Sequence, residues 1–289
     1  MRAGDRRLGY ALLAPAVLVL LAVTGYPLVY NLWNSFRHVN LSRAGSGGWA
    51  GVSNYTALAH GGYGSALERT LGFTAVSVVL ETLVGLGLAL MLHRAFRGRG
   101  LLRAAVLIPW AVPTVVSATL WKTMFDPRTG FVDYLLGLVH LPGSSTTWLA
   151  GEWTSWAAVL VADAWKNVPF IAIILLAGLQ VIPTEIYEAA RIDGATAWQS
   201  FRRMTLPLLR PALLVALVFR TLSAFLVFDV VYIMTGGGPG TSTETLSYLD
   251  WHTFLVDTDF GFGGAVSVSL VVISLVIAGA YVRLLRPKT

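Results

Sequence analysis

The run from Thr70 to Leu92 reads TLGFTAVSVVLETLVGLGLALML and carries a single ionisable residue, Glu81. A helix of this length and polarity is long and apolar enough to cross a bilayer hydrocarbon core of about 30 Å. Five further stretches, before and after it, have the same character. The six predicted spans are residues 8–36, 70–92, 101–125, 155–182, 208–234 and 263–285. The sequence therefore predicts an all-α membrane protein with six transmembrane helices, forming a single domain over residues 1–289.

The composition excludes an ordinary soluble protein. Hydrophobic residues make up 55% of the chain and charged residues only 12%, about half the share in globular proteins. The charged residues lie mainly between the apolar stretches, so the net charge of +6 follows membrane topology and indicates no nucleic-acid partner. The first apolar run is too long for a signal peptide, and we expect it to be retained. There is no cysteine, and the histidines are too scattered to suggest a metal site: His38, His60, His93, His140 and His252.

The positive charges predict the orientation of the spans. Cytoplasmic segments of membrane proteins carry an excess of Lys and Arg. With the N-terminus inside, the outer segments hold only Arg37, Arg43, Arg69 and Arg128. The cytoplasmic segments then hold Arg2, Arg6, Arg7, Arg94, Arg97, Arg99, Arg103, Arg191, Arg202, Arg203, Arg210, Arg283, Arg286 and Lys288. Both termini are therefore predicted to be cytoplasmic.

The segment between the fourth and fifth predicted spans, residues 183–207, reads PTEIYEAARIDGATAWQSFRRMTLP. Pro183 suits the first turn of a helix, and Glu185 and Glu188 follow near its positive N-terminal end. Gly194 is placed to end that helix in a left-handed conformation.

A second short helix is indicated within the same segment. Thr196 and Gln199 match a capping box, and Pro207 is expected to end this helix. The small residues of the resulting helix–turn–helix allow the surface of another protein to approach closely. On these residues alone, an ordinary structured loop punctuated by glycine and proline remains an open alternative.

Glu188-Ala189-Ala190, Gly194 and Leu206-Pro207 resemble the cytoplasmic EAA loop of ABC importer permeases. The resemblance extends along nearly the whole chain and is greatest to sugar permeases of the maltose-transporter type. Met204 stands where that family usually has Ile. Similar blocks are Tyr26-Pro27, Asn54-Tyr55, Pro109 with Pro113, Asp126-Pro127 with Gly130, residues 165–170 (WKNVPF) and residues 235–239 (TGGGP). The resemblance implies the type I ABC importer permease fold in a bacterial plasma (inner) membrane.

The resemblance also implies the partners and the role of the chain. It would be a non-catalytic membrane subunit that translocates a sugar, a di- or oligosaccharide, by alternating access. The expected partners are an ATP-binding subunit (two copies or a dimer), a second six-span permease, an extracytoplasmic sugar-binding protein and the lipid bilayer. No Gly-x-x-x-x-Gly-Lys-[Ser/Thr] loop occurs and no cofactor is expected on this chain, so ATP and Mg²⁺ would be used by the partner ATPase. The residues expected to couple to that ATPase are Glu188, Ala189, Ala190, Asp193, Gly194, Leu206 and Pro207.

Ionisable residues within the spans are costly if they face lipid, so we expect them to face the bundle or a cavity. Arg220 can pair with Glu81 or Asp163 as a structural contact, whereas Lys122 and Asp229 lie near span ends and can reach the interface. In the resembling family the sugar lies between two permease subunits and is contacted from the fourth and fifth spans. The positions that match those contacts are Asn167, Phe170, Arg220, Ser223 and Ala224.

Two alternatives differ in the solute or in the energy source. An ABC permease for glycerol-3-phosphate or a polyol is compatible with the same loop, and Arg220 keeps a phosphorylated solute open. An ion-coupled secondary transporter could use Glu81, Asp163 and Asp229 as a proton relay. That class predicts inverted repeats and broken helices in matching halves, and the sequence shows neither. A membrane enzyme would need a catalytic grouping, which the sequence lacks.

Overall fold

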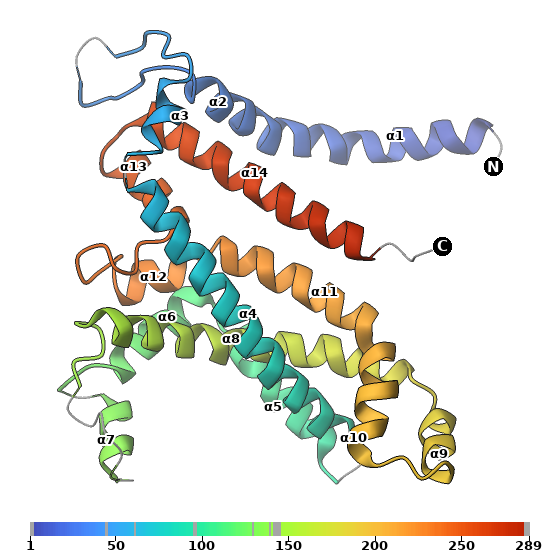
Figure 1. The fold of residues 1–289 in the computed structure, drawn as a ribbon. Helices are drawn as coiled ribbons and strands as arrows, with labels where there is room; N and C mark the ends of the chain where they lie inside the picture. Colours follow the sequence, from blue (N-terminus) through green and yellow to red (C-terminus); the bar gives the residue numbers. More distant parts are fainter. Residues whose placement is uncertain are drawn as a thin grey trace. The chain divides into compact units, whose positions relative to one another are not determined.

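The computed structural model describes residues 3–43, 46–60, 62–94, 97–128, 130–138, 140 and 146–285. Within these residues the regular elements are helices, together with isolated β-bridges (Figure 1). Arg2, Arg286 and Lys288, which belong to the predicted cytoplasmic charges, lie outside the described residues. The chain divides into two compact units, Met1–Gly64 with Leu249–Val272, and Ser65–Tyr248 with Ile273–Thr289.

The first unit begins with the long N-terminal helix predicted as the first span. Helix α1 (Ala3–Leu20) passes through a π-helical turn, η1 (Leu21–Gly25), into α2 (Tyr26–Asn34). The unit also contains α3 (Ser53–Ala57), most of α13 (Leu246–Leu255) and the first half of α14 (Phe260–Leu285). The amide of Asn54 donates hydrogen bonds of 2.9 Å to the carbonyls of Ser35 and Arg37. These bonds fix the turn that follows α2 against α3.

The second unit is built around α8 (Glu152–Val181). Helices that pack against it include α5 (Arg99–Ala111), α6 (Thr114–Met124), α11 (Leu206–Phe225) and α12 (Asp229–Met234). One apolar cluster joins α8 to α6 and α12 through Val159, Val231 and their neighbours. A second cluster, near the other end of α8, joins α8 to α4 (Tyr63–His93) and α11 and includes Leu92, Leu175 and Leu209. A short helix, α7 (Phe131–Leu138), follows α6.

The prediction of membrane spans is confirmed at five places along the described chain. Helices long and apolar enough to cross a membrane cover Leu12–Asn34, Tyr63–His93, Glu152–Val181, Ala197–Phe225 and Phe260–Leu284. A sixth span is completed only if the bent pair α5 and α6 counts as one. Helices α4, α8 and α14 begin three to seven residues before the predicted spans, because helices continue past the hydrocarbon core into the interface, whereas their C-terminal ends lie within one residue of the predicted ones.

The third predicted span, residues 101–125, is not one helix. It consists of α5 and α6, which meet at 91°. Val112 adopts an extended conformation (φ −69°, ψ 132°) because the ring of Pro113 disfavours a helical residue before it. The ammonium of Lys166 on α8 donates to the freed carbonyls of Val112 and Trp110, the latter at 3.3 Å. This donor satisfies backbone groups that would otherwise be unpaired within the membrane.

The fifth predicted span, residues 208–234, is also broken. Helix α11 ends at Phe225, and the chain resumes as α12 after a short non-helical turn. The hydroxyl of Thr245 donates to the carbonyl of Val227 at 3.0 Å, which satisfies the backbone at the break. The prediction that Pro207 ends the second loop helix is wrong as well. Pro207 lies at the start of α11, directly after the π-helical turn η2, and the helix runs on through it from Ala197 to Phe225.

Candidate functional site

The segment between α8 and α11 forms the predicted helix–turn–helix. Helix α9 (Thr184–Ile192) begins directly after Pro183. It ends at Gly194, whose φ of +75° is the left-handed conformation expected for it. The Ala195 N–H donates to the Ala190 carbonyl at 2.9 Å, and the Gly194 N–H donates to the Arg191 carbonyl at 3.1 Å. This pair of bonds is a Schellman motif, which satisfies the last carbonyls of α9.

The second helix, α10 (Ala197–Ser200), starts with the capping box that the sequence predicts. The Gln199 N–H donates to the Thr196 hydroxyl at 3.3 Å, and the Thr196 N–H donates to the Gln199 side-chain oxygen at 2.8 Å. Helix α10 then continues through a π-helical turn, η2 (Phe201–Thr205), directly into α11. The turn between α9 and α10 is therefore attached without a break to a membrane-spanning helix. We call residues 183–207 the coupling segment.

The coupling segment exposes one face and buries the other. Glu188, Ala189 and Asp193 are exposed, whereas Ala190 is buried. A Cβ atom built on Gly194 meets no atom within 4 Å, so this position needs glycine for its backbone conformation and not for space. At the end of the segment, Leu206 is half-buried and Pro207 is exposed.

Two large apolar side chains of the coupling segment were not singled out from the sequence. Ile192 is 87% exposed and Trp198 is 66% exposed, one on each side of the turn. A signal was present in the sequence, because Ile192 falls on the otherwise polar face of α9. Both side chains are accessible at the surface of this chain.

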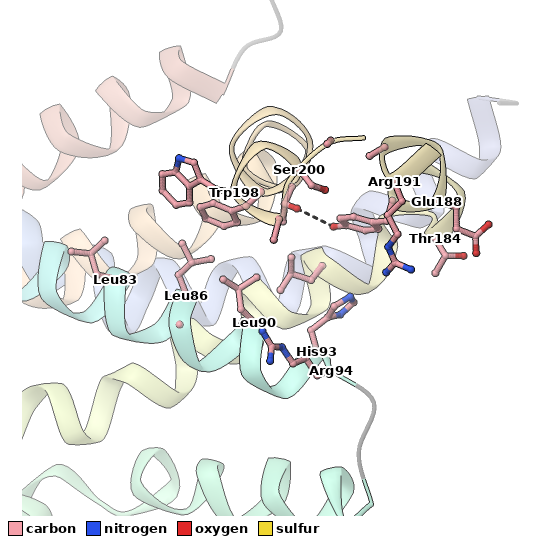
Figure 2. Close-up of a pocket in the computed structure, with 18 residues that line it drawn as sticks. Leu83, Leu86, Leu90, His93, Arg94, Thr184, Glu188, Arg191, Trp198 and Ser200 are labelled. Atoms are coloured by element: carbon pink, nitrogen blue, oxygen red, sulfur yellow. Dashed lines mark hydrogen bonds between the residues drawn. The ribbon is translucent and has the colours of Figure 1, made fainter. Parts of the chain in front are cut away.

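A cavity of about 1140 Å³ lies behind the coupling segment, between α4 and α9–α10 (Figure 2). Leu83, Leu86 and Leu90 line it from α4, and Trp198 and Ser200 line it from α10. The hydroxyls of Tyr187 and Thr205, 3.2 Å apart, connect α9 to η2 within this lining.

Farther into the second unit, three buried ionisable residues form a network across three helices. Arg220 on α11 forms ion pairs with Glu81 on α4 and Asp163 on α8. A second bond runs from Arg220 Nη2 to Glu81 Oε1 at 2.9 Å. Asn167 donates to Asp163 Oδ1 at 2.8 Å, and Ser223 accepts from Arg220 Nη1 at 3.2 Å. We call these five residues the buried ion network; it confirms the predicted pairing, with both candidate carboxylates engaged.

The five residues expected to contact solute are therefore in different surroundings. Arg220 and Ala224 are buried, and the charge of Arg220 is neutralised within the chain. Asn167 is half-buried and belongs to the network, whereas Ser223 is exposed. Phe170 stacks on Trp110 of α5, with ring centroids 5.5 Å apart and planes at 12°. Phe170 thus holds α8 against the helix that leads into the 91° bend.

The architecture matches a family of transport proteins. The model of the "binding-protein-dependent transport system inner membrane component" family matches residues 81–289. The chain belongs to this family. This assignment identifies the chain as a membrane permease of an ABC transporter and not as an ion-coupled secondary transporter, and it indicates no enzymatic family.

Relatives of this permease cover it almost completely. It is 39% identical to the trehalose/maltose transport system permease protein MalF of Thermococcus litoralis, over 98% of this chain and 95% of that protein. It is also 39% identical to the trehalose transport system permease protein SugA of Mycobacterium tuberculosis, over 98% and 90%. A chain in the crystal structure of a bacterial ABC transporter involved in the import of alginate has the same fold. The two chains superpose with a TM-score of 0.84 and are 24% identical in sequence, and the match covers 99% of this permease and 97% of that chain.

Proposed function

We propose that this permease is a membrane-spanning subunit of an ATP-driven importer that takes up a di- or oligosaccharide delivered by a solute-binding protein. The observation that carries the proposal is the 39% identity, over 98% of the chain, to two permeases named for trehalose transport. Trehalose and maltose are the first candidate solutes. The whole chain, residues 1–289, acts as one permease domain of the type I fold, with both termini cytoplasmic as its positive charges favour.

The buried ion network supports a neutral solute over a phosphorylated one. Arg220 is the one arginine predicted deep within a span, and both Glu81 and Asp163 pair with it. A guanidinium held by two carboxylates has no net positive charge to offer an anion. Glycerol-3-phosphate therefore loses the feature that favoured it, whereas a polyol or a neutral sugar does not. Asn167, Phe170 and Ser223 remain the candidates for solute contacts, and Arg220 and Ala224 support them from behind.

The coupling segment is the proposed contact with the ATP-binding subunit, which binds and hydrolyses ATP with Mg²⁺. Its exposed face offers Glu188, Asp193 and Ile192, and Ala189 and Gly194 leave room for close approach. A second permease subunit and an extracytoplasmic sugar-binding protein complete the assembly.

A continuous helix supports a mechanical role for this contact. The chain runs from α10 through η2 and α11 without a loop, and Arg220 lies about 21 Å along α11 from Leu206. A displacement of the coupling segment would therefore reach the buried ion network through one rigid element. That network joins α11 to α4 and α8, so the three helices would move together as the solute path changes its access.

Reconstitution tests the proposal directly. The permease, its sister subunit, the ATPase and the binding protein are placed in liposomes, and uptake of labelled trehalose, maltose and glycerol-3-phosphate is measured. We expect uptake of a neutral disaccharide that requires ATP and the binding protein and persists when an ionophore abolishes the proton gradient. Uptake driven by an imposed proton gradient without ATP would refute the proposed energy source. Uptake of glycerol-3-phosphate alone would refute the proposed solute.

A further inference from the structure

The cavity behind the coupling segment has the dimensions and chemistry of a lipid site. Its wall on α4 runs from Leu83 to His93, a distance of about 15 Å along a helix. Helix α4 has 31 residues and is therefore about 46 Å long, so its end passes beyond a hydrocarbon core of about 30 Å. With residues 70–92 as the predicted span, we expect the leucines of the wall at acyl-chain depth, and His93 and Arg94 at headgroup depth.

The charges on the rim favour an anion. Arg94 and Arg191 line the cavity from opposite sides, and both are exposed. Neither forms an ion pair with a carboxylate among the residues that the structure describes. Figure 2 shows Arg191 directed toward His93, whereas the carboxylate of Glu188 points away from α4. Glu188 is the one acidic residue of the lining, so the two guanidiniums leave the rim positive.

We propose that this cavity binds an anionic phospholipid between α4 and α9. The phosphate lies at Arg94 and Arg191, and an acyl chain lies along Leu83, Leu86 and Leu90. Basic pockets between membrane helices at the headgroup level bind anionic lipids in this manner. The bound lipid contacts α4 and α9 at once, so it braces the coupling segment against the bundle. This site is independent of the identity of the transported solute.

The test measures lipid binding by the assembled transporter. Native mass spectrometry is used to titrate the purified complex with phosphatidylglycerol and, separately, with phosphatidylcholine. Arg94→Gln and Arg191→Gln should each weaken phosphatidylglycerol binding about fivefold, and the double variant about 25-fold. Phosphatidylcholine binding should not change. The matched control is Arg97→Gln/Arg210→Gln, since both arginines are exposed and neither lines the cavity.

Further arms distinguish a lipid from other occupants. Leu86→Trp fills the apolar wall without altering the rim charge, and it should reduce phosphatidylglycerol binding as well. Soluble glycerol phosphate should compete weakly, because it lacks an acyl chain; competition as strong as that of the lipid would overturn the proposal. Equal lipid binding by the rim double variant and by its control would also overturn it. So would binding by the isolated permease but not by the complex, because a partner subunit would then fill the cavity.

Discussion

Removal of the Arg220 guanidinium should destabilise the permease severely. Arg220 is 4% exposed, and its two partners, Glu81 and Asp163, are 0% and 8% exposed. Arg220→Met keeps most of the side-chain volume but leaves two carboxylates facing each other away from water. Breaking a buried pair by removing one partner costs about 3–5 kcal/mol. We expect a loss in that range, or a shift of the thermal midpoint by about 5–8 °C for a chain of 289 residues.

A triple variant provides a stricter test of the same site. Replacement of all three charges, as Glu81→Gln/Asp163→Asn/Arg220→Met, removes the unpaired carboxylates together with the guanidinium. This triple variant should be more stable than Arg220→Met alone, because neutral buried groups cost less than unpaired charges. Stability is measured by thermal unfolding of the detergent-purified protein, with Arg210→Met as an exposed-arginine control on the same helix. An Arg220→Met variant as stable as this control would refute the buried ion network.

Three further variants test other parts of the structure. Lys166→Met leaves the carbonyls at the α5–α6 bend without their donor. It should lower the free energy of unfolding by about 1–3 kcal/mol. An unchanged free energy would show that water replaces the ammonium. Gly178→Ala places a Cβ 2.5 Å from the Cβ of Ala212, which overpacks the contact between α8 and α11. Thermal unfolding should show that the free energy of unfolding falls by about 1–3 kcal/mol. Gly87→Ala is the control, because its added Cβ meets no atom within 4 Å and should cause no such loss. Burial raises the pKa of Asp250 to about 6, although the Ser267 hydroxyl, 2.8 Å away, opposes the shift. Because folding favours the protonated form, the free energy of unfolding should fall by roughly 2 kcal/mol as pH rises from about 4 to 6. Asp250→Asn should abolish this pH dependence.

The spans and the caps of the coupling segment could be predicted because their causes are local. An uninterrupted apolar run requires a membrane helix, and Thr196, Gln199 and Gly194 act within four residues of their partners. Each element could therefore be identified from a short window of sequence.

The breaks in the third and fifth spans could not be predicted in the same way. Pro113 within the third apolar run is compatible with a kink, a bend or a break, and no proline marks the break after Phe225 in the fifth run. The donors that satisfy the backbone at these breaks are distant in the sequence. Lys166 donates to the carbonyl of Val112, 54 residues away, and Thr245 donates to the carbonyl of Val227, 18 residues away. The sequence likewise predicts that Arg220 faces the interior, but the neutralisation of its charge depends on Glu81 and Asp163, 139 and 57 residues away.

The central claim is that the coupling segment transmits ATP hydrolysis to the membrane helices, and Gly194→Asp tests it most directly. Gly194 has φ +75°, and a side chain there costs roughly 1–3 kcal/mol. Gly62→Asp is the matched control, because Gly62 has φ +76° and an equally open surrounding outside the coupling segment. Glu188→Lys, with Glu152→Lys as control, tests the exposed carboxylate of the same segment.

The measurement is binding-protein-stimulated ATPase activity together with uptake in proteoliposomes, after membrane insertion and ATPase recovery have been checked. We predict that Gly194→Asp and Glu188→Lys insert normally but lose both stimulated hydrolysis and uptake at least about fivefold, whereas Gly62→Asp and Glu152→Lys retain them. Stimulated hydrolysis, uptake and ATPase recovery that all remain normal in Gly194→Asp and Glu188→Lys would contradict the account and leave the segment as an ordinary structured loop.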